Sequence, residues 1–99
     1  MALGLYRILQ EALQNTIRHS GAAEAVVELR AEPDRILLTV SDTGSGFDVE
    51  RARREGGLGL SSMQERVRLL HGTLAVTSAP GQGTRIEVSV PWVRRESGA

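Results

Sequence analysis

The spacing of hydrophobic residues predicts helices in two parts of the chain. In residues 2–19 hydrophobic side chains return every three or four positions, as on one face of an α-helix, and residues 60–71 repeat this spacing. Gly21 and Gly72 follow the two segments, where C-terminal caps are common. We therefore expect two amphipathic helices with buried stripes made by Leu5, Ile8, Leu9, Ala12, Leu13 and Thr16 in the first and by Leu60, Met63, Val67 and Leu70 in the second.

A period of two predicts a β-hairpin in residues 23–42. Residues 23–32 and 35–42 each alternate between hydrophobic and polar side chains, and only Pro33-Asp34 separates them. So short a connection favours antiparallel pairing. In the first strand we expect one polar face and one hydrophobic face, the latter made by Ala25, Val27, Leu29 and Ala31.

Residues 73–79 and 83–91 predict two further strands, joined by Pro80-Gly81-Gln82-Gly83. Residues 47–56 between the hairpins are polar and charged, and we expect a mobile surface loop, with a helical turn inside it as an open alternative. Four strands and two helices of these lengths predict an α+β fold in two layers, with a mostly antiparallel sheet and the helices on one face.

Composition limits the kind of protein. Ninety-nine residues, 40% of them hydrophobic, fit one domain with a modest core. The absence of cysteine excludes disulfides and thiolate sites, and 12 basic against 12 acidic residues argue against binding nucleic acid through bulk charge. Neither a signal peptide nor an apolar run of about 18 residues is present. We expect a cytoplasmic domain without membrane contact, and a frayed tail at residues 94–99.

Asp42 is the first candidate for chemistry. It shares the strand face of Ile36, Leu38 and Val40, so its carboxylate points toward the interior edge, where an unpaired charge is costly. A ligand can supply the donor that it needs. The alternative is an Asx-type turn, in which Asp42 accepts hydrogen bonds from the loop that contains Gly44 and Gly46. Both glycines let the backbone turn sharply and let a bulky group approach.

The first helix carries a second set of polar candidates. Glu11 and Asn15 lie four residues apart and share a face, with Arg18 and His19 one turn further on. This set places an acid, an amide and basic groups in a line along the helix. The alternative is a solvated face on which Glu11 pairs with Arg7.

A glycine-rich segment precedes the second helix. Gly56-Gly57-Leu58-Gly59-Leu60 leads into the helix start, where free amides and the helix dipole favour an anion. The alternative is that these glycines only allow the backbone to turn before the helix. Ser62 and Glu65 fit a capping box, with Ser61 as the other possible cap.

The candidates converge on one cleft. Thr84 lies on the same face of the last predicted strand as that strand's hydrophobic residues, and Asp42 lies on the hydrophobic face of its own strand. If these two strands are neighbours in the sheet, the two side chains come together. A cleft between the helices and the strand ends would then supply an acid and an amide for a metal, a buried carboxylate and bare amides. A nucleotide with magnesium needs such a set, and its members are Glu11, Asn15, Asp42, Gly44, Gly46, Gly57, Gly59 and Thr84.

Four segments resemble motifs of the ATPase superfamily that joins gyrase, Hsp90, histidine kinases and MutL. Residues 9–19 look like its N box, residues 42–47 its Asp-x-Gly-x-Gly box, Gly57-Leu58-Gly59-Leu60 its second glycine box, and Gly83-Thr84 its late Gly-Thr pair. The residue pattern of the N box and the short lid, residues 47–56, are similar to those of sensor histidine kinases paired with regulators of the NarL and LuxR type. The resemblance covers about residues 3–91 and implies a Bergerat-type fold, with residues 1–93 as the ATP-binding catalytic domain.

The resemblance also implies roles for the candidates. Asp42 would accept the exocyclic amine of adenine with help from Thr84, and Asn15 would coordinate Mg²⁺. Glu11 would polarise the nucleophile or help to hold the metal. The remaining implied contacts, to the phosphates and the closing lid, involve Arg18, His19, Gly44, Gly46, Gly57, Leu58, Gly59 and Leu60.

The phosphoacceptor histidine that the resemblance implies is not found, because His19 lies in the N box and His71 closes a helix. We expect a catalytic domain that binds ATP, cannot phosphorylate itself and is a monomer in isolation. Its partners would be a separate dimerisation and phosphotransfer domain and, indirectly, a response regulator. The sequence leaves open whether the parent kinase is anchored in a membrane. The alternatives are an anti-sigma-type serine kinase, a nucleotide-binding module without turnover, and an ATP hydrolase related to MutL or gyrase.

Overall fold

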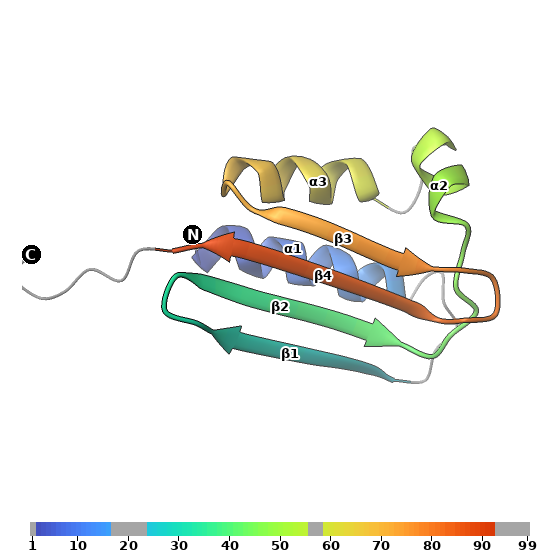
Figure 1. The fold of residues 1–99 in the computed structure, drawn as a ribbon. Coiled ribbons are helices and arrows are strands. Elements are labelled where there is room, and N and C mark those ends of the chain that lie inside the picture. Colours follow the sequence, from blue (N-terminus) through green and yellow to red (C-terminus); the bar gives the residue numbers. More distant parts are fainter. Residues whose placement is uncertain (1, 17–23, 56–58, 93–99) are drawn as a thin grey trace, which may run out of the picture.

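The computed structural model describes residues 2–16, 24–55 and 59–92. Figure 1 shows the elements in chain order: α1 (Ala2–Asn15), β1 (Ala25–Ala31), β2 (Arg35–Asp42), α2 (Val49–Glu55), α3 (Leu60–Leu69), β3 (Thr73–Ser78) and β4 (Thr84–Pro91). Within these ranges no helix is long and hydrophobic enough to cross a membrane. The predicted tail at residues 94–99 lies outside the described residues.

The four strands form one sheet in the order β1-β2-β4-β3, and each neighbouring pair is antiparallel. Both predicted hairpins are therefore confirmed. The two hairpins join through β2 and β4, which form the centre of the sheet. This pairing places Asp42 directly opposite Thr84, as the shared parity of the two residues predicted.

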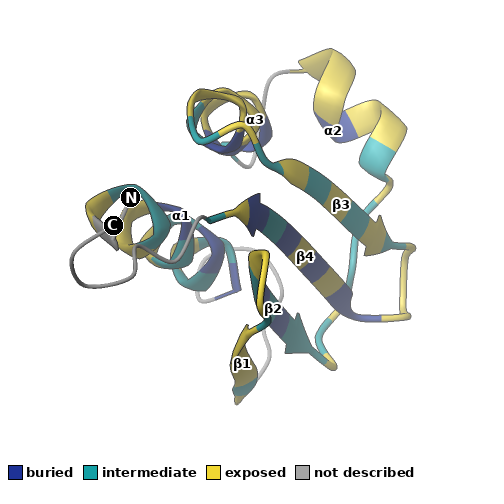
Figure 2. Cartoon of the chain, turned by 60° about the vertical axis from the view of Figure 1, so that its left-hand side comes forward, coloured by how far each residue is buried: buried dark blue, intermediate teal, exposed yellow. Residues whose placement is uncertain are grey.

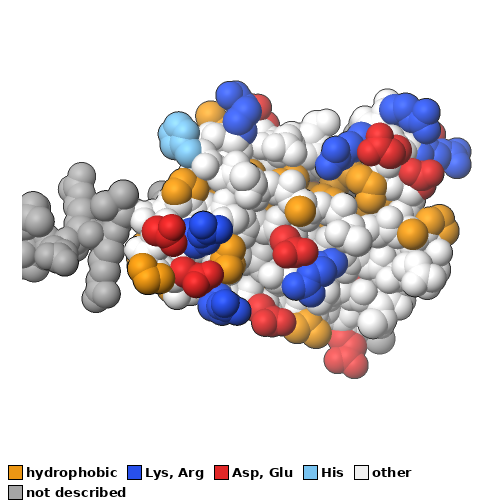
Figure 3. Space-filling view, viewed as in Figure 1, with side chains coloured by type: hydrophobic (Ala, Val, Ile, Leu, Met, Phe, Trp, Pro, Cys, Tyr) orange, Lys and Arg blue, Asp and Glu red, His pale blue; other side chains and the backbone are white. Residues whose placement is uncertain are grey.

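Helices α1 and α3 cover one face of the sheet (Figure 2), which confirms the predicted two-layer α+β fold. The core lies between these helices and the sheet, and the opposite sheet face carries interspersed acidic and basic side chains (Figure 3). Ile8, Met63, Val67 and Val90 have no exposed surface. The full set of buried hydrophobic residues is Ile8, Ala12, Leu38, Val40, Ala52, Leu60, Met63, Val67, Ile86, Val88 and Val90.

Helix α2 corrects the prediction of a surface loop between the hairpins. The carboxylate of Asp48 accepts a hydrogen bond from the backbone amide of Arg51 at 3.1 Å and so caps the helix start. Arg51 and Glu55 then form an ion pair one turn apart, at 3.0 Å. Only Ala52 is buried, so the hydrophobic pattern gave no periodic signal for this helix.

The predicted hydrophobic face of strand β1 is partly exposed. Leu29 is 68% exposed and Val27 is 41% exposed. The reason is the position of the strand: β1 lies at the edge of the sheet, while the buried strand residues come from β2 and β4. Alternation predicted the strand correctly, but it does not show whether a strand lies in the centre or at the edge of a sheet.

The start of α3 differs from the predicted capping box. The N-cap is Gly59, in the left-handed conformation at φ 64°, and no side chain caps the helix. Glu65 instead forms an ion pair with Arg68 at 2.6 Å. The first turn of α3 thus keeps amide groups without a side-chain acceptor.

Candidate functional site

Three polar side chains form a row across one end of the sheet. Asp42 of β2 lies opposite Thr84 of β4, and Thr84 lies opposite Ser78 of β3. Directly opposed residues in antiparallel strands share a face, and in this row it is the face that the helices cover. Thr84 is buried, and Asp42 and Ser78 are half-buried. The row therefore lies at the rim of the core.

The Asp42 carboxylate is held from two sides. Its Oδ1 accepts a hydrogen bond from the backbone amide of Gly44 at 2.8 Å, and its Oδ2 lies 3.3 Å from the hydroxyl of Thr16, whose single hydrogen is shared with the carbonyl oxygen of Ala12 at the same distance. The first contact is the Asx-type turn considered from the sequence. The second turns the carboxylate toward the end of α1, next to Asn15. The turn and the inward orientation therefore coexist.

Ser78 is a site residue that the sequence analysis missed. Its hydroxyl donates to the carbonyl oxygen of Gly83 at 2.8 Å and accepts from the backbone amide of Phe47 at 2.9 Å. A hydroxyl has one hydrogen, so in the 3.1 Å contact between the two side chains Thr84 donates to Ser78. The Thr84 oxygen then offers lone pairs to a donor. Hairpin register would have found Ser78, since it opposes Thr84.

Two of the loop glycines are needed where backbones meet. A Cβ on Gly46, at φ 65°, would overlap the carbonyl oxygen of Ala79, and a Cβ on Gly83, at φ 72°, would overlap the carbonyl oxygen of Asp42. The loop after β2 therefore packs directly on the β3–β4 hairpin. For Gly46 this packing explains the glycine without a ligand.

The second part of the site lies where α1 meets α3. A Cβ on Gly59 would overlap the Glu11 carboxylate, so the acid of α1 lies directly against the start of α3. Asn15, the last residue of α1, is half-buried and precedes Thr16. This arrangement brings together a carboxylate, an amide and uncapped helix amides.

The described residues hold no cluster of three His, Cys, Asp or Glu side chains for a metal ion. Glu11 and Asn15 lie one turn apart and offer two oxygen donors, which fits Mg²⁺, an ion that commonly takes one or two protein ligands and completes its shell with phosphate oxygens and water.

A hollow of about 350 Å³ opens at the strand ends beside the polar row. Its wall includes Asp42, Ser78, Gly83 and Thr84 together with Ser41, Thr77 and Arg85, which oppose one another on the open face of the sheet, and it includes no described residue of α1 or α3. A larger hollow of about 390 Å³ lies on the open face of the sheet between charged side chains such as Glu28 and Arg85, and it contains none of the predicted site residues. The chemistry therefore favours the smaller hollow.

Not every predicted site residue takes its place in this site. The side chain of Leu60 is 5% exposed and belongs to the core, so only its backbone is open to a ligand. Arg18, His19, Gly57 and Leu58 lie outside the described residues. The structure thus brings Asp42, Thr84 and Gly44 into one group and Glu11 and Gly59 into another.

The perturbed pKa values lie away from the site. A hydrogen bond from Arg68 lowers the pKa of the Glu65 carboxyl, and the same bond raises the pKa of Arg68. A hydrogen bond to Glu55 raises the pKa of Arg51. All of these side chains are exposed members of helical ion pairs, so the shifts reflect local pairing on α2 and α3.

Comparison with known families places the geometry in context. The family model for the histidine kinase-, DNA gyrase B-, and HSP90-like ATPase matches residues 2–94. The sensor protein VraS of Staphylococcus aureus is 42% identical over 93 residues, which is 94% of this chain and 26% of that protein. VraS of Staphylococcus epidermidis is similar to the same extent. The chain thus spans about a quarter of the curated relatives it matches.

Solved structures share the fold. The ATP binding domain of PrrB from Mycobacterium tuberculosis aligns with a TM-score of 0.78 at 23% identity, over 95% of this chain and 71% of that one. The histidine kinase domain of the blue-light activated kinase EL346 from Erythrobacter litoralis aligns with a TM-score of 0.67 at 30% identity, over 85% of this chain and 41% of that one.

Proposed function

The chain belongs to the family of histidine kinase-, DNA gyrase B-, and HSP90-like ATPases, and from this premise we propose that it binds ATP with Mg²⁺ as the catalytic domain of a sensor histidine kinase. The observation that carries the proposal is the inward-turned carboxylate of Asp42. It lies opposite Thr84 and 3.3 Å from the hydroxyl of Thr16, which directly follows α1.

Asp42 supplies the means to recognise adenine. Each carboxylate oxygen has two acceptor positions, and the contacts to Gly44 and Thr16 use one on each oxygen. An acceptor position therefore remains for the exocyclic amine of adenine. Thr84 adds lone pairs one strand away, suited to a water molecule that bridges to the base. A purine that carries a carbonyl group in place of the amine would face these acceptors with another acceptor.

The phosphates would lie toward the junction of α1 and α3. Asn15 and Glu11 would hold Mg²⁺, which would offset the charge of the phosphate oxygens. The uncapped amides at the start of α3 add donors and the positive end of the helix dipole. Gly57 and Gly59 would let the lid backbone close over the phosphates, with Arg18 and His19 as further phosphate contacts.

The phosphoryl acceptor would be a histidine on a dimerisation helix outside this chain. The relatives named VraS are sensor proteins, and the chain matches about a quarter of their length. Transfer breaks the bond between the γ-phosphorus and its bridging oxygen and forms a bond to an imidazole nitrogen. Glu11 would polarise that imidazole or help to hold the metal. A response regulator of the NarL and LuxR type would then receive the phosphoryl group.

Titration with a fluorescent ATP analogue, with and without Mg²⁺, tests this assignment on the wild type, Asp42→Ala and Asn15→Ala. Hydrogen bonds to a charged group are worth about 1.5–3 kcal/mol, so we expect Asp42→Ala to weaken binding about 10- to 100-fold. Asn15→Ala should mainly remove the gain in affinity that Mg²⁺ gives. The exposed Asp34→Ala and Gln14→Ala are matched controls and should bind as the wild type does.

Equal binding by all five proteins would contradict the proposed site. Supplying the histidine-bearing helix in trans then tests turnover. Binding without transfer to that helix would favour a nucleotide-binding module, and transfer to a serine of a protein partner would favour an anti-sigma-type kinase.

A further inference from the structure

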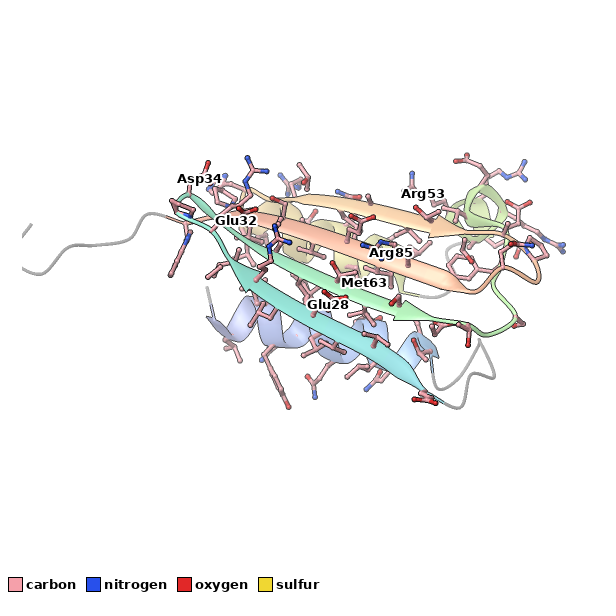
Figure 4. The ribbon with its side chains drawn as sticks, turned by 60° about the horizontal axis from the view of Figure 1, so that its bottom comes forward. Glu28, Glu32, Asp34, Arg53, Met63 and Arg85 are labelled. Carbon is pink, nitrogen blue, oxygen red and sulfur yellow. The ribbon has the colours of Figure 1, made fainter. Side chains whose placement is uncertain are left out.

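The outer edge of β1 is a surface that the ATP site does not explain. Among the residues that the structure describes, no strand pairs with this edge, which Figure 4 shows nearest the viewer along the sheet. The seven residues of β1 pair with β2 without a bulge, and they include no proline. Bulges and prolines are features by which natural edge strands avoid pairing with another chain. Charged residues are another such feature, and β1 carries one of each sign, Glu28 and Arg30.

Both faces of this edge strand are partly hydrophobic. On the helix side, Val27 and Leu29 are 41% and 68% exposed, and on the open side Val26 is 55% exposed. A second strand beside β1 would remove hydrophobic surface from water and would satisfy the free backbone groups together.

We propose that two copies of this chain pair through β1, antiparallel, about a two-fold axis perpendicular to the sheet. The two four-stranded sheets then become one continuous sheet, with the helices of both copies on the same side. Such an interface is isologous, because the same strand contributes from each copy. The proposal is independent of the ATP site and replaces the sequence-based expectation of a monomer, which did not foresee an uncovered edge.

The charges on β1 select one register. A two-fold axis of this kind requires opposed residues to share a face, so the pairing is centred on a single residue. Centred on Leu29, each Glu28 faces the partner's Arg30, and the two Leu29 side chains meet at the axis. Two ion pairs thus form on the open face, and opposed opposite charges stabilise a pair of strands.

The other registers are less favourable. Centring on Glu28 places the two carboxylates opposite each other, and centring on Arg30 does the same for the two guanidinium groups. Centring on Val27 leaves Glu28 opposite Val26, and it pairs Arg30 with Glu24, which lies before the start of the strand. The Leu29 register therefore satisfies the pattern best. Arg30 can take part, since its side chain is 74% exposed and its ion pair with Glu32 of the same chain is a long contact of 4.0 Å.

The mass in solution tests the proposal, measured by size exclusion with light scattering over a wide range of protein concentration. We expect the wild type to approach twice the 10.7 kDa of one chain as concentration rises. Leu29→Lys places two ammonium groups at the axis and should give a monomer at every concentration. Ala75→Lys, at an exposed position of the other edge strand, is the matched control and should dimerise as the wild type does.

Charge reversal tests the register. Glu28→Arg alone and Arg30→Glu alone each oppose like charges, so each should be monomeric or at least tenfold weaker in dimerisation. Mixing these two proteins restores opposite charges across the axis, and the mixture should form a heterodimer. The doubly reversed Glu28→Arg/Arg30→Glu protein should again form a homodimer.

Circular dichroism on every variant separates loss of pairing from loss of fold. A wild type that stays monomeric throughout would overturn the proposal, as would a Leu29→Lys protein that still dimerises. A mixture of the two single reversals that remains monomeric, while the wild type dimerises, would reject this register and with it the proposed interface.

Discussion

At Gly83 the backbone of the β3–β4 hairpin passes so close to the end of β2 that a side chain has no room. A Cβ there would overlap the carbonyl oxygen of Asp42. The same glycine has a φ of 72°, in the left-handed region. One residue therefore fixes the approach of the hairpin to the carboxylate on which the site depends.

Gly83→Ala and Gly81→Ala separate steric contact from backbone strain. Both glycines have a positive φ, but Gly81 has no atoms within 4 Å of the Cβ position. We expect Gly81→Ala to lower the free energy of unfolding by about 1 kcal/mol, the cost of the left-handed conformation. Gly83→Ala should cost about 1–3 kcal/mol more, as overpacking does. Urea unfolding measures both, and equal losses would contradict the close contact.

At this scale the sequence located part of the site. Strand parity predicted that Asp42 and Thr84 would share a face, and the register confirms it. Ser78 was not predicted as a site residue, because a serine at a strand end has many ordinary roles. The contact between Glu11 and Gly59 was also hidden, since it joins residues 48 positions apart and depends on how α1 packs on α3.

At the scale of the elements, the C-terminal end of α3 holds a backbone conformation whose energetic cost a single substitution can measure. The amide of Gly72 donates to the carbonyl of Val67 and the amide of His71 donates to the carbonyl of Arg68, which together form a Schellman motif. His71 takes the left-handed position of this motif at φ 58°, a conformation that favours glycine. The protein thus carries strain at this helix end.

His71→Gly should therefore stabilise the fold by about 1 kcal/mol, because glycine adopts this conformation without a steric cost. Thermal unfolding with circular dichroism measures the gain. His71→Ala is the control, since it removes the imidazole but keeps the Cβ. An equal gain from both changes would show that the imidazole, and not the backbone, is the cause.

The elements also show where sequence patterns lose information. Periodicity identified α1, α3 and all four strands within a few residues. It missed α2, whose stability rests on the Asp48 cap, one ion pair and the single buried residue Ala52. It also gave no sign that the hydrophobic face of β1 is exposed, because alternation reports the two faces of a strand and not its neighbours in the sheet.

For the whole molecule, one core between the helices and the sheet carries the stability. Ile8 has no exposed surface, and Ile8→Ala should lower the free energy of unfolding by about 2–5 kcal/mol through lost burial and a cavity. Leu69→Ala, at a position that is 66% exposed, should change it by less than about 0.5 kcal/mol.

Trp92 offers a second probe of this unfolding, since its indole donates to the carbonyl of Glu32 at the far end of the sheet. Fluorescence and circular dichroism should report the same midpoint if the molecule unfolds as one unit. Separate midpoints would show that α1 and the strand ends do not share a single cooperative core.

The central claim is that the inward-turned carboxylate of Asp42 recognises the amine of adenine. Calorimetric titration of the wild type with ATP and with inosine triphosphate, both with Mg²⁺, tests it most directly, because the two differ in the amine that becomes a carbonyl. The account predicts that ATP binds at least about tenfold more tightly, since the carbonyl would leave Asp42 facing another acceptor. Equal affinities for the two nucleotides would contradict it.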